Sequence, residues 1–246
     1  MLFLLRKIRR KLVQKNRFTT YLLYAIGEIV LVVIGILLAV RINNWNTQRT
    51  EEQLQLKYYQ NIITDLKKDS VHLTRILSGF KRRQTNYYAI YREVSTSVEE
   101  ADQPVYDYLL YNAQFAPTMI KNQQQVIDDI KDNSVRQLIN EYSENLTSVQ
   151  IAIDEYNLCV YDLMRPYTLK KKVWNVENVF QPDVYAFLPE ESVIDQASKR
   201  KLFGDEELLQ ILAYQRISTG FSIFELEGMI KVNEELKQSL QAKLDD

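Results

Sequence analysis

The chain of 246 residues is long enough for one domain with an appendage, and its 31 basic and 32 acidic residues nearly cancel. This balance argues against a nucleic-acid-binding protein. One histidine and one cysteine, His72 and Cys159, exclude an intramolecular disulfide and a usual zinc site within one chain. Six glycines and five prolines are few for this length, which favours long helices.

The N-terminal segment, residues 1–20, predicts a basic amphipathic helix on the cytoplasmic side. Leu5, Ile8 and Leu12 recur at helical spacing, and no acid precedes Glu28. The other side of this helix carries the basic residues Arg6, Lys7, Arg9, Arg10 and Lys11. Such a helix suits an anionic membrane surface, whereas the alternative is a frayed basic tail that only sets topology.

Residues 21–40 predict a transmembrane helix. They read YLLYAIGEIVLVVIGILLAV, with Glu28 as the one charge, and twenty helical residues span about 30 Å, the thickness of the bilayer core. Aromatic residues flank the segment at Tyr21 and Trp45, and the basic excess before it places the N-terminus in the cytoplasm. The rival reading, a cleaved signal peptide, would have a shorter apolar run followed by a small-residue cleavage site.

The run from Arg6 to Trp45, with its basic start, its YAIGEIVLVVIGILLAV span and its closing INNW, resembles a known pattern. It is similar to the opening of an uncharacterised family of single-pass inner-membrane proteins of flavobacteria and their relatives. A weaker similarity covers Val126 to Tyr142, where this chain lacks the Ser-Gly turn common in that family. The family has no assigned activity, so the resemblance implies topology and lineage alone.

Glu28 lies about 10 Å into the span, where an acid costs about 2.5–3.5 kcal/mol on insertion scales. Helical spacing places Tyr24, Glu28, Gly35 and Ala39 on one face, and the last two form a small-xxx-small pair. We expect this face to be a helix–helix interface in which a protonated Glu28 donates a hydrogen bond. The alternatives are a tolerated acid reached by water, and ion or proton coupling in a channel, transporter or motor.

Residues 41–246 predict an extracytoplasmic all-α domain, an antiparallel bundle of long helices. Apolar residues at spacings of three and four run from Tyr59 to Tyr91, interrupted by Asp69, and no turn signal separates this helix from the span. A short helix is expected over 105–115. A heptad-patterned helix should follow Asn133 or Ser134, and a last helix should start at Asp205.

Residues 165–204 form an irregular region with three prolines and an expected short helix from Glu191 to Leu202. This region contains a basic run next to a tryptophan, namely Lys170, Lys171, Lys172 and Trp174. A connection of this length is usually functional or mobile, so we predict a loop that contacts a partner. A crossover packed on the bundle is the equal alternative.

The sequence contains no phosphate-binding glycine loop and no nucleophile elbow, so we expect neither an enzyme nor a cofactor. The expected function is a membrane-anchored scaffold or accessory subunit of the bacterial inner membrane. Its expected partners are membrane lipids and either further copies of the chain or another membrane protein. One alternative is a component of an ion-coupled channel, transporter or motor that uses Glu28. A second alternative is an extracytoplasmic ligand sensor.

Overall fold

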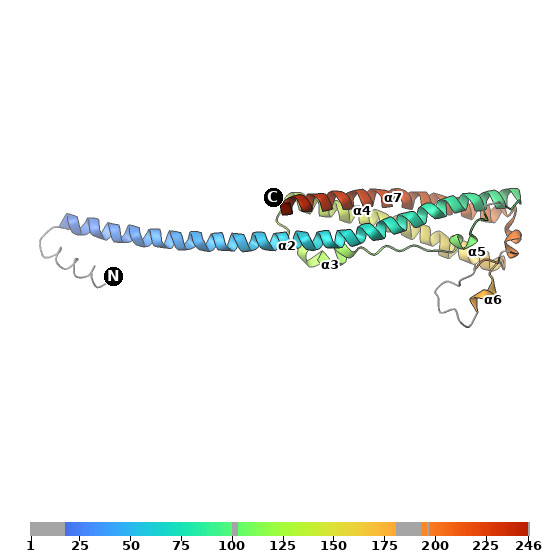
Figure 1. Cartoon of the computed structure of the whole chain (residues 1–246), viewed down its shortest axis with the longest axis horizontal. Coiled ribbons are helices and arrows are strands. Elements are labelled where there is room, and N and C mark those ends of the chain that lie inside the picture. Colours follow the sequence, from blue (N-terminus) through green and yellow to red (C-terminus); the bar gives the residue numbers. More distant parts are fainter. Residues whose placement is uncertain (1–17, 100–102, 181–192, 196, 246) are drawn as a thin grey trace. The chain divides into compact units, whose positions relative to one another are not determined.

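The computed structural model describes residues 18–99, 103–180, 193–195 and 197–245, with the backbone alone for 18–21 (Figure 1). Within these ranges every regular element is helical, and one antiparallel bridge joins Trp174 to Ile194. The predicted all-α class is therefore confirmed. The chain divides into two compact units, Met1–Leu56 and Lys57–Asp246.

The first long helix, α2, extends from Phe18 to Thr96 and belongs to both units. The sequence predicted this continuity, because no proline or turn cluster follows the apolar span. The unit boundary at Leu56 lies beyond residue 40, where we expected the outer domain to start. The stretch 41–56 is helical and largely exposed, and it belongs to the first unit together with the span.

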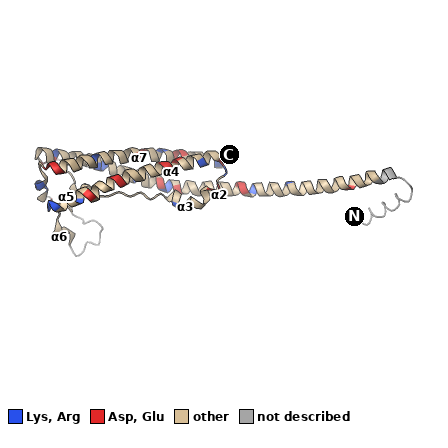
Figure 2. Cartoon of the chain, turned by 180° about the vertical axis from the view of Figure 1, so that it is seen from behind, with Lys and Arg blue, Asp and Glu red and all other residues tan. Residues whose placement is uncertain are grey.

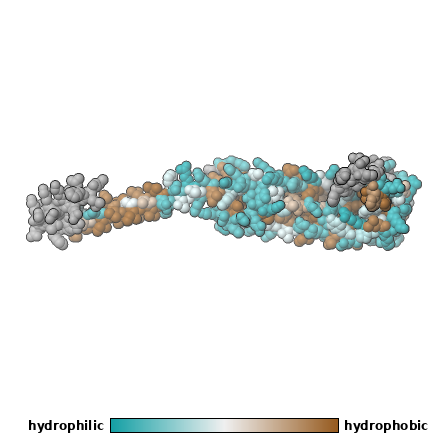
Figure 3. All heavy atoms as spheres, turned by 90° about the horizontal axis from the view of Figure 1, so that it is seen from below, coloured by the Kyte–Doolittle hydropathy of each residue, from teal (hydrophilic) through white to brown (hydrophobic). Residues whose placement is uncertain are grey.

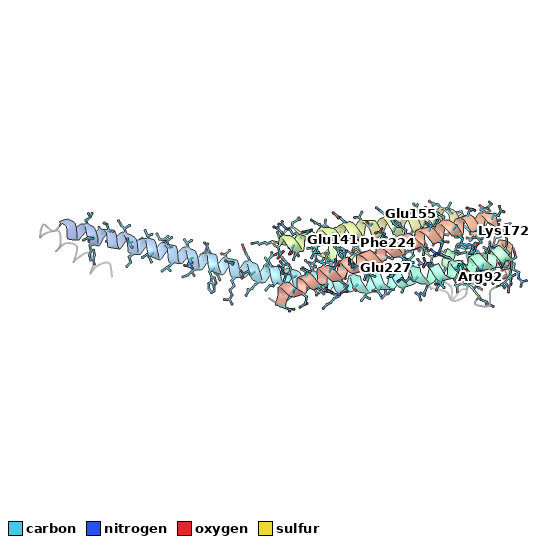
Figure 4. The ribbon with its side chains drawn as sticks, turned by 90° about the horizontal axis from the view of Figure 1, so that it is seen from above. Arg92, Glu141, Glu155, Lys172, Phe224 and Glu227 are labelled. Atoms are coloured by element: carbon cyan, nitrogen blue, oxygen red, sulfur yellow. The ribbon has the colours of Figure 1, made fainter. Side chains whose placement is uncertain are left out.

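The second unit contains three long helices that lie side by side: the outer part of α2, α4 (Asn133–Leu158) and α7 (Glu206–Asp245) (Figures 1 and 4). Two contacts with each neighbour give the direction of α7. Against α4, Ser222 Oγ donates to the Ala152 carbonyl at 3.1 Å and the Tyr214 hydroxyl donates to Glu155 at 3.5 Å. Against α2, Asn233 Nδ2 donates to the Leu66 carbonyl at 3.3 Å and Glu227 forms an ion pair with Lys81 at 2.7 Å. Helix α7 runs antiparallel to the other two, as the predicted bundle requires.

The chain between α2 and α4 differs from the expected short helix over 105–115. The structure has a single 3-10 turn, η1 (Tyr106–Leu109), then irregular chain, then α3 (Thr118–Ile127), which the sequence did not predict. Side chains of the long helices take the place of helical hydrogen bonds here. The Asn86 amide pairs with both backbone groups of Val105 at 2.7 and 2.8 Å. Asn157 pairs in the same way with Ala113 at 2.8 and 2.9 Å.

The described part of the region predicted as irregular, residues 165–180, 193–195 and 197–204, contains short elements. It follows a π-helical segment, η2 (Cys159–Met164), and its described elements are α5 (Arg165–Lys170), α6 (Val176–Val179) and η3 (Ser198–Leu202). The helix predicted over 191–202 is wrong in its described part, where only η3 is helical. The reason is tertiary: the buried Asp107 carboxylate accepts hydrogen bonds from the backbone N–H of Val193 and of Ile194, both at 2.9 Å.

The start of α7 agrees with the sequence. Gly204 has a φ of 69°, a left-handed conformation that suits glycine, and Asp205 caps the helix through a hydrogen bond from the Leu208 amide at 3.1 Å. The core of the unit consists of two hydrophobic clusters. One includes Leu66, Phe80 and Leu226, and the other includes Ile90, Leu109 and Leu202.

Candidate functional site

The apolar part of α2 is long enough and apolar enough to cross a membrane, and it lies near the N-terminus. None of its most apolar window is buried inside the chain. Figure 3 shows this stretch as a band of hydrophobic residues, and Figure 2 shows few charges along it. Its large side chains are exposed, for example Leu23 at 71% and Leu31 at 73%. Without a membrane or a protein partner, they would be in water. The hydrophobic effect therefore favours a lipid or protein environment around it.

The four residues of the predicted transmembrane interface all lie in this stretch. Tyr24, Glu28 and Ala39 are exposed. A Cβ atom added at Gly35 would meet nothing within 4 Å, so no contact inside the described chain explains this glycine. The four residues share one helical face by their spacing. Their role as an interface stays a prediction, and the basic residues Arg6, Lys7, Arg9, Arg10 and Lys11 lie outside the described residues.

The predicted partner loop is bound to its own domain at several points. Lys171 forms an ion pair with Asp205, and Lys170 forms an exposed one with Glu207 at 3.3 Å. Trp174 is half-buried and donates its indole N–H to Thr168 Oγ1 at 2.9 Å. These contacts match the crossover alternative.

Lys172 completes this basic run. It has a φ of 52°, and its carbonyl accepts a hydrogen bond from Lys201 Nζ at 3.1 Å. Lys170 and Lys172 are exposed, so a partner could reach both side chains. Partner binding by the loop stays a prediction.

Four acids of the described residues are buried, and the sequence pattern marked none of them as a site. Asp65 accepts hydrogen bonds from Asn122 and Gln123 of α3, at 3.1 and 2.7 Å. The other three organise the outer unit. The first is Asp69, which appeared in the sequence only as an interruption of an apolar stripe. It is fully buried and accepts hydrogen bonds from the amides of Thr118 at 2.6 Å and Met119 at 3.0 Å. It therefore caps α3 from another helix. The sequence signal that could have indicated this role is the position of Asp69, an acid at a core position of an apolar row.

The second and third acids act in the second hydrophobic cluster. Asp107 holds the chain at residues 193 and 194, as described above. Glu93 is fully buried, forms an ion pair with the buried Lys199 at 3.1 Å and accepts a hydrogen bond from the Tyr106 hydroxyl at 2.7 Å. Burial, followed by this hydrogen bond, raises the pKa of Tyr106 well above its usual range, so its hydroxyl remains a donor. These acids hold separate elements of the outer unit together through hydrogen bonds and an ion pair, which is a structural role.

The lone cysteine and the lone histidine lie in different environments. Cys159 is a buried free thiol, and burial raises its pKa to about 12, which makes it a poor nucleophile. His72 is exposed on α2. Within the described ranges, no three His, Cys, Asp or Glu residues gather as a metal-binding group.

Comparison with known proteins gives one match. Residues 28–103 are similar to a family described as "Family of unknown function (DUF6090)". This stretch covers most of the apolar span and all of the later part of α2. No curated protein matches the chain. No solved structure matches it either. The match agrees with the expected similarity to an uncharacterised family, and it assigns no activity.

Proposed function

We propose that this chain is a membrane-anchored scaffold or accessory subunit that acts through helix-mediated contacts between proteins. Its N-terminus would lie in the cytoplasm, its span in the bacterial inner membrane and its helical unit in the periplasm. The observation that carries the proposal is the apolar stretch of α2, which has no partner inside the described chain and yet contains Glu28.

The energetic argument concerns what can cover that stretch. Leucine and valine gain little by leaving lipid for another helix, because lipid tails are as apolar as they are. Small residues such as Gly35 and Ala39 allow close backbone approach, and a protonated Glu28 can donate a hydrogen bond across the contact. The expected interface is therefore the face of Tyr24, Glu28, Gly35 and Ala39.

The test compares two glycines of the same helix in the full chain, crosslinked in native membranes. Gly35→Ile should weaken the crosslinked or co-purified species at least several-fold. Gly27→Ile is the matched control, since Gly27 also has open space around it but lies about a quarter turn off the predicted face. If the two variants behave alike, the interface proposal is wrong.

Glu28 also supports the second candidate function, coupling to an ion or proton. Under the scaffold proposal, Glu28→Gln preserves both assembly and function, because the amide still forms hydrogen bonds. Under ion coupling, the same variant assembles normally but does not restore the wild-type phenotype to a strain that lacks the protein, because the carboxyl group that would carry the proton or bind the ion is gone.

A further inference from the structure

The middle of α7 reverses the usual pattern of a bundle helix. At spacings of three, four and three, large apolar residues point away from the core: Tyr214, Ile217, Phe221 and Phe224. Their exposed fractions are 38%, 67%, 39% and 71%. At the same level, the residues that face the core are polar: Gln215, Thr219 and Ser222 are fully buried. The outward row is thus more hydrophobic than the inward one.

Helix α4 widens this exposed row into a face. Ile151 and Leu158 are 58% and 55% exposed. Their level along the bundle is fixed by two hydrogen bonds between α4 and α7: Ser222 Oγ to the Ala152 carbonyl at 3.1 Å, and the Tyr214 hydroxyl to Glu155 at 3.5 Å. Figure 4 shows the two helices side by side, with Glu155 labelled on α4 and Phe224 on α7.

We call these six residues the α4–α7 face: Ile151, Leu158, Tyr214, Ile217, Phe221 and Phe224. Taking the exposed fractions above and about 150–200 Å² for a large apolar side chain, the face exposes roughly 500–600 Å². The largest apolar patch of a typical monomer is about 300–600 Å² and often functional, and this face reaches the upper end of that range. Two such faces together would bury roughly 1,100 Å², which passes the minimum of about 1,000 Å² for a specific interface.

We propose that a second copy of this chain covers the α4–α7 face. The α7 row is symmetric about Thr219, so it is complementary to itself in either direction. In a parallel pair each residue meets its own copy, and in an antiparallel pair Ile217 meets Phe221 while Tyr214 meets Phe224. The row has the spacing of a coiled-coil seam. Its next positions, Gln210 and Gly228, carry no charge that would repel a copy.

The candidate membrane span adds a second reason for a copy of the same chain. Proteins held in one membrane meet at a raised effective concentration, so even a modest face can associate. This pairing is separate from the transmembrane interface proposed above, because it uses residues of the second unit alone. The two contacts can therefore be disrupted one at a time.

The test uses single cysteines in the full chain, in native membranes, with a short membrane-permeant bismaleimide. Ile217→Cys alone, or coexpressed with Phe221→Cys, should give a product of twice the chain mass, at least fivefold above the control. Arg216→Cys is the matched control, because Arg216 is exposed in the same turn but off the row. The parent chain serves as the blank, since Cys159 is fully buried.

Two results would overturn the proposal. One is a yield for both arrangements no higher than for Arg216→Cys. The other is a product whose mass shows a different protein. As a further arm, Ile217→Glu with Phe224→Glu should abolish crosslinking through Tyr214→Cys, while Cys159 stays protected and so reports an intact fold. The crosslinks should survive Gly35→Ile, which separates this proposal from the transmembrane interface.

Discussion

The hydroxyl of Tyr142 donates a hydrogen bond to Asp69 Oδ2 at 2.8 Å, which joins α4 to α2 in the interior of the bundle. Burial, followed by the charge of Asp69, raises the pKa of Tyr142 well above its usual range, so the hydroxyl stays protonated and keeps donating. The same carboxylate caps α3 at Thr118 and Met119. One side chain therefore fixes three helices relative to one another.

Asp69→Ala should destabilise the outer unit by about 2–3 kcal/mol, because it leaves the buried Met119 amide, the buried Tyr142 hydroxyl and the part-buried Thr118 amide without their acceptor. Tyr142→Phe removes one donor and should cost less, about 1 kcal/mol. Urea unfolding of the full chain in detergent measures both. Asp154→Ala, at an exposed site of α4, is the control and should lie within about 0.5 kcal/mol of the parent. An Asp69→Ala protein as stable as this control would refute the capping role.

The buried pair Glu93–Lys199 predicts strong non-additivity. Lys199→Met leaves a buried carboxylate without its cation and should cost about 3–5 kcal/mol. Adding Glu93→Gln removes that charge and keeps an acceptor for the Tyr106 hydroxyl, so the double variant should recover much of the loss. Thermal unfolding of the parent, both single variants and the double variant completes the cycle. Additive losses would show that the two charges do not interact.

Cys159 should be inert in the native protein. Its thiol is buried and its pKa is raised to about 12 by burial, so little reactive thiolate forms at neutral pH. A chromogenic thiol reagent should titrate less than a tenth of it within an hour, and all of it within minutes in denaturant. Fast labelling of the native chain would contradict the buried placement of η2.

Stability should fall in acid, partly through Asp132. The hydrogen bond from Lys243, followed by that from Ser134, lowers the pKa of Asp132 well below its usual range. Its folded pKa is therefore below the unfolded value of about 3.9, so the stabilisation is present above that pH and is lost as the pH falls through the folded pKa. Asp132 is also the N-cap of α4, where its side chain accepts hydrogen bonds from the backbone N–H of Ser134 at 2.8 Å and of Val135 at 3.2 Å. Asp132→Asn keeps this capping oxygen and removes the charge.

This variant should cost about 0.5–1 kcal/mol at neutral pH, a small value because the ion pair is partly exposed. Its unfolding free energy should also fall less steeply than that of the parent between pH 5 and 2. Parallel pH profiles for the two proteins would contradict this assignment.

The sequence predicts the long helices because each repeats its apolar residues over many turns, as α4 does from Val135 to Tyr156. It fails where distant side chains satisfy the backbone. Asn86 and Asn157 hold the chain between α2 and α3 in an irregular path, and neither residue carries a local signal of that role. Likewise, the Glu93–Lys199 pair joins residues that only the folded bundle brings together. In the span, spacing predicts a face, and no contact within the described residues tests it.

The most direct test of the account is the topology of the full chain. Two reporters would be fused in turn after Asp246, alkaline phosphatase, which is active only outside the cytoplasm, and β-galactosidase, which is active only inside it. A single span with a basic cytoplasmic N-terminus predicts active phosphatase and inactive galactosidase, with both fusions in the membrane fraction. Active galactosidase with inactive phosphatase, or fusions released as soluble protein, would contradict the membrane-anchored scaffold.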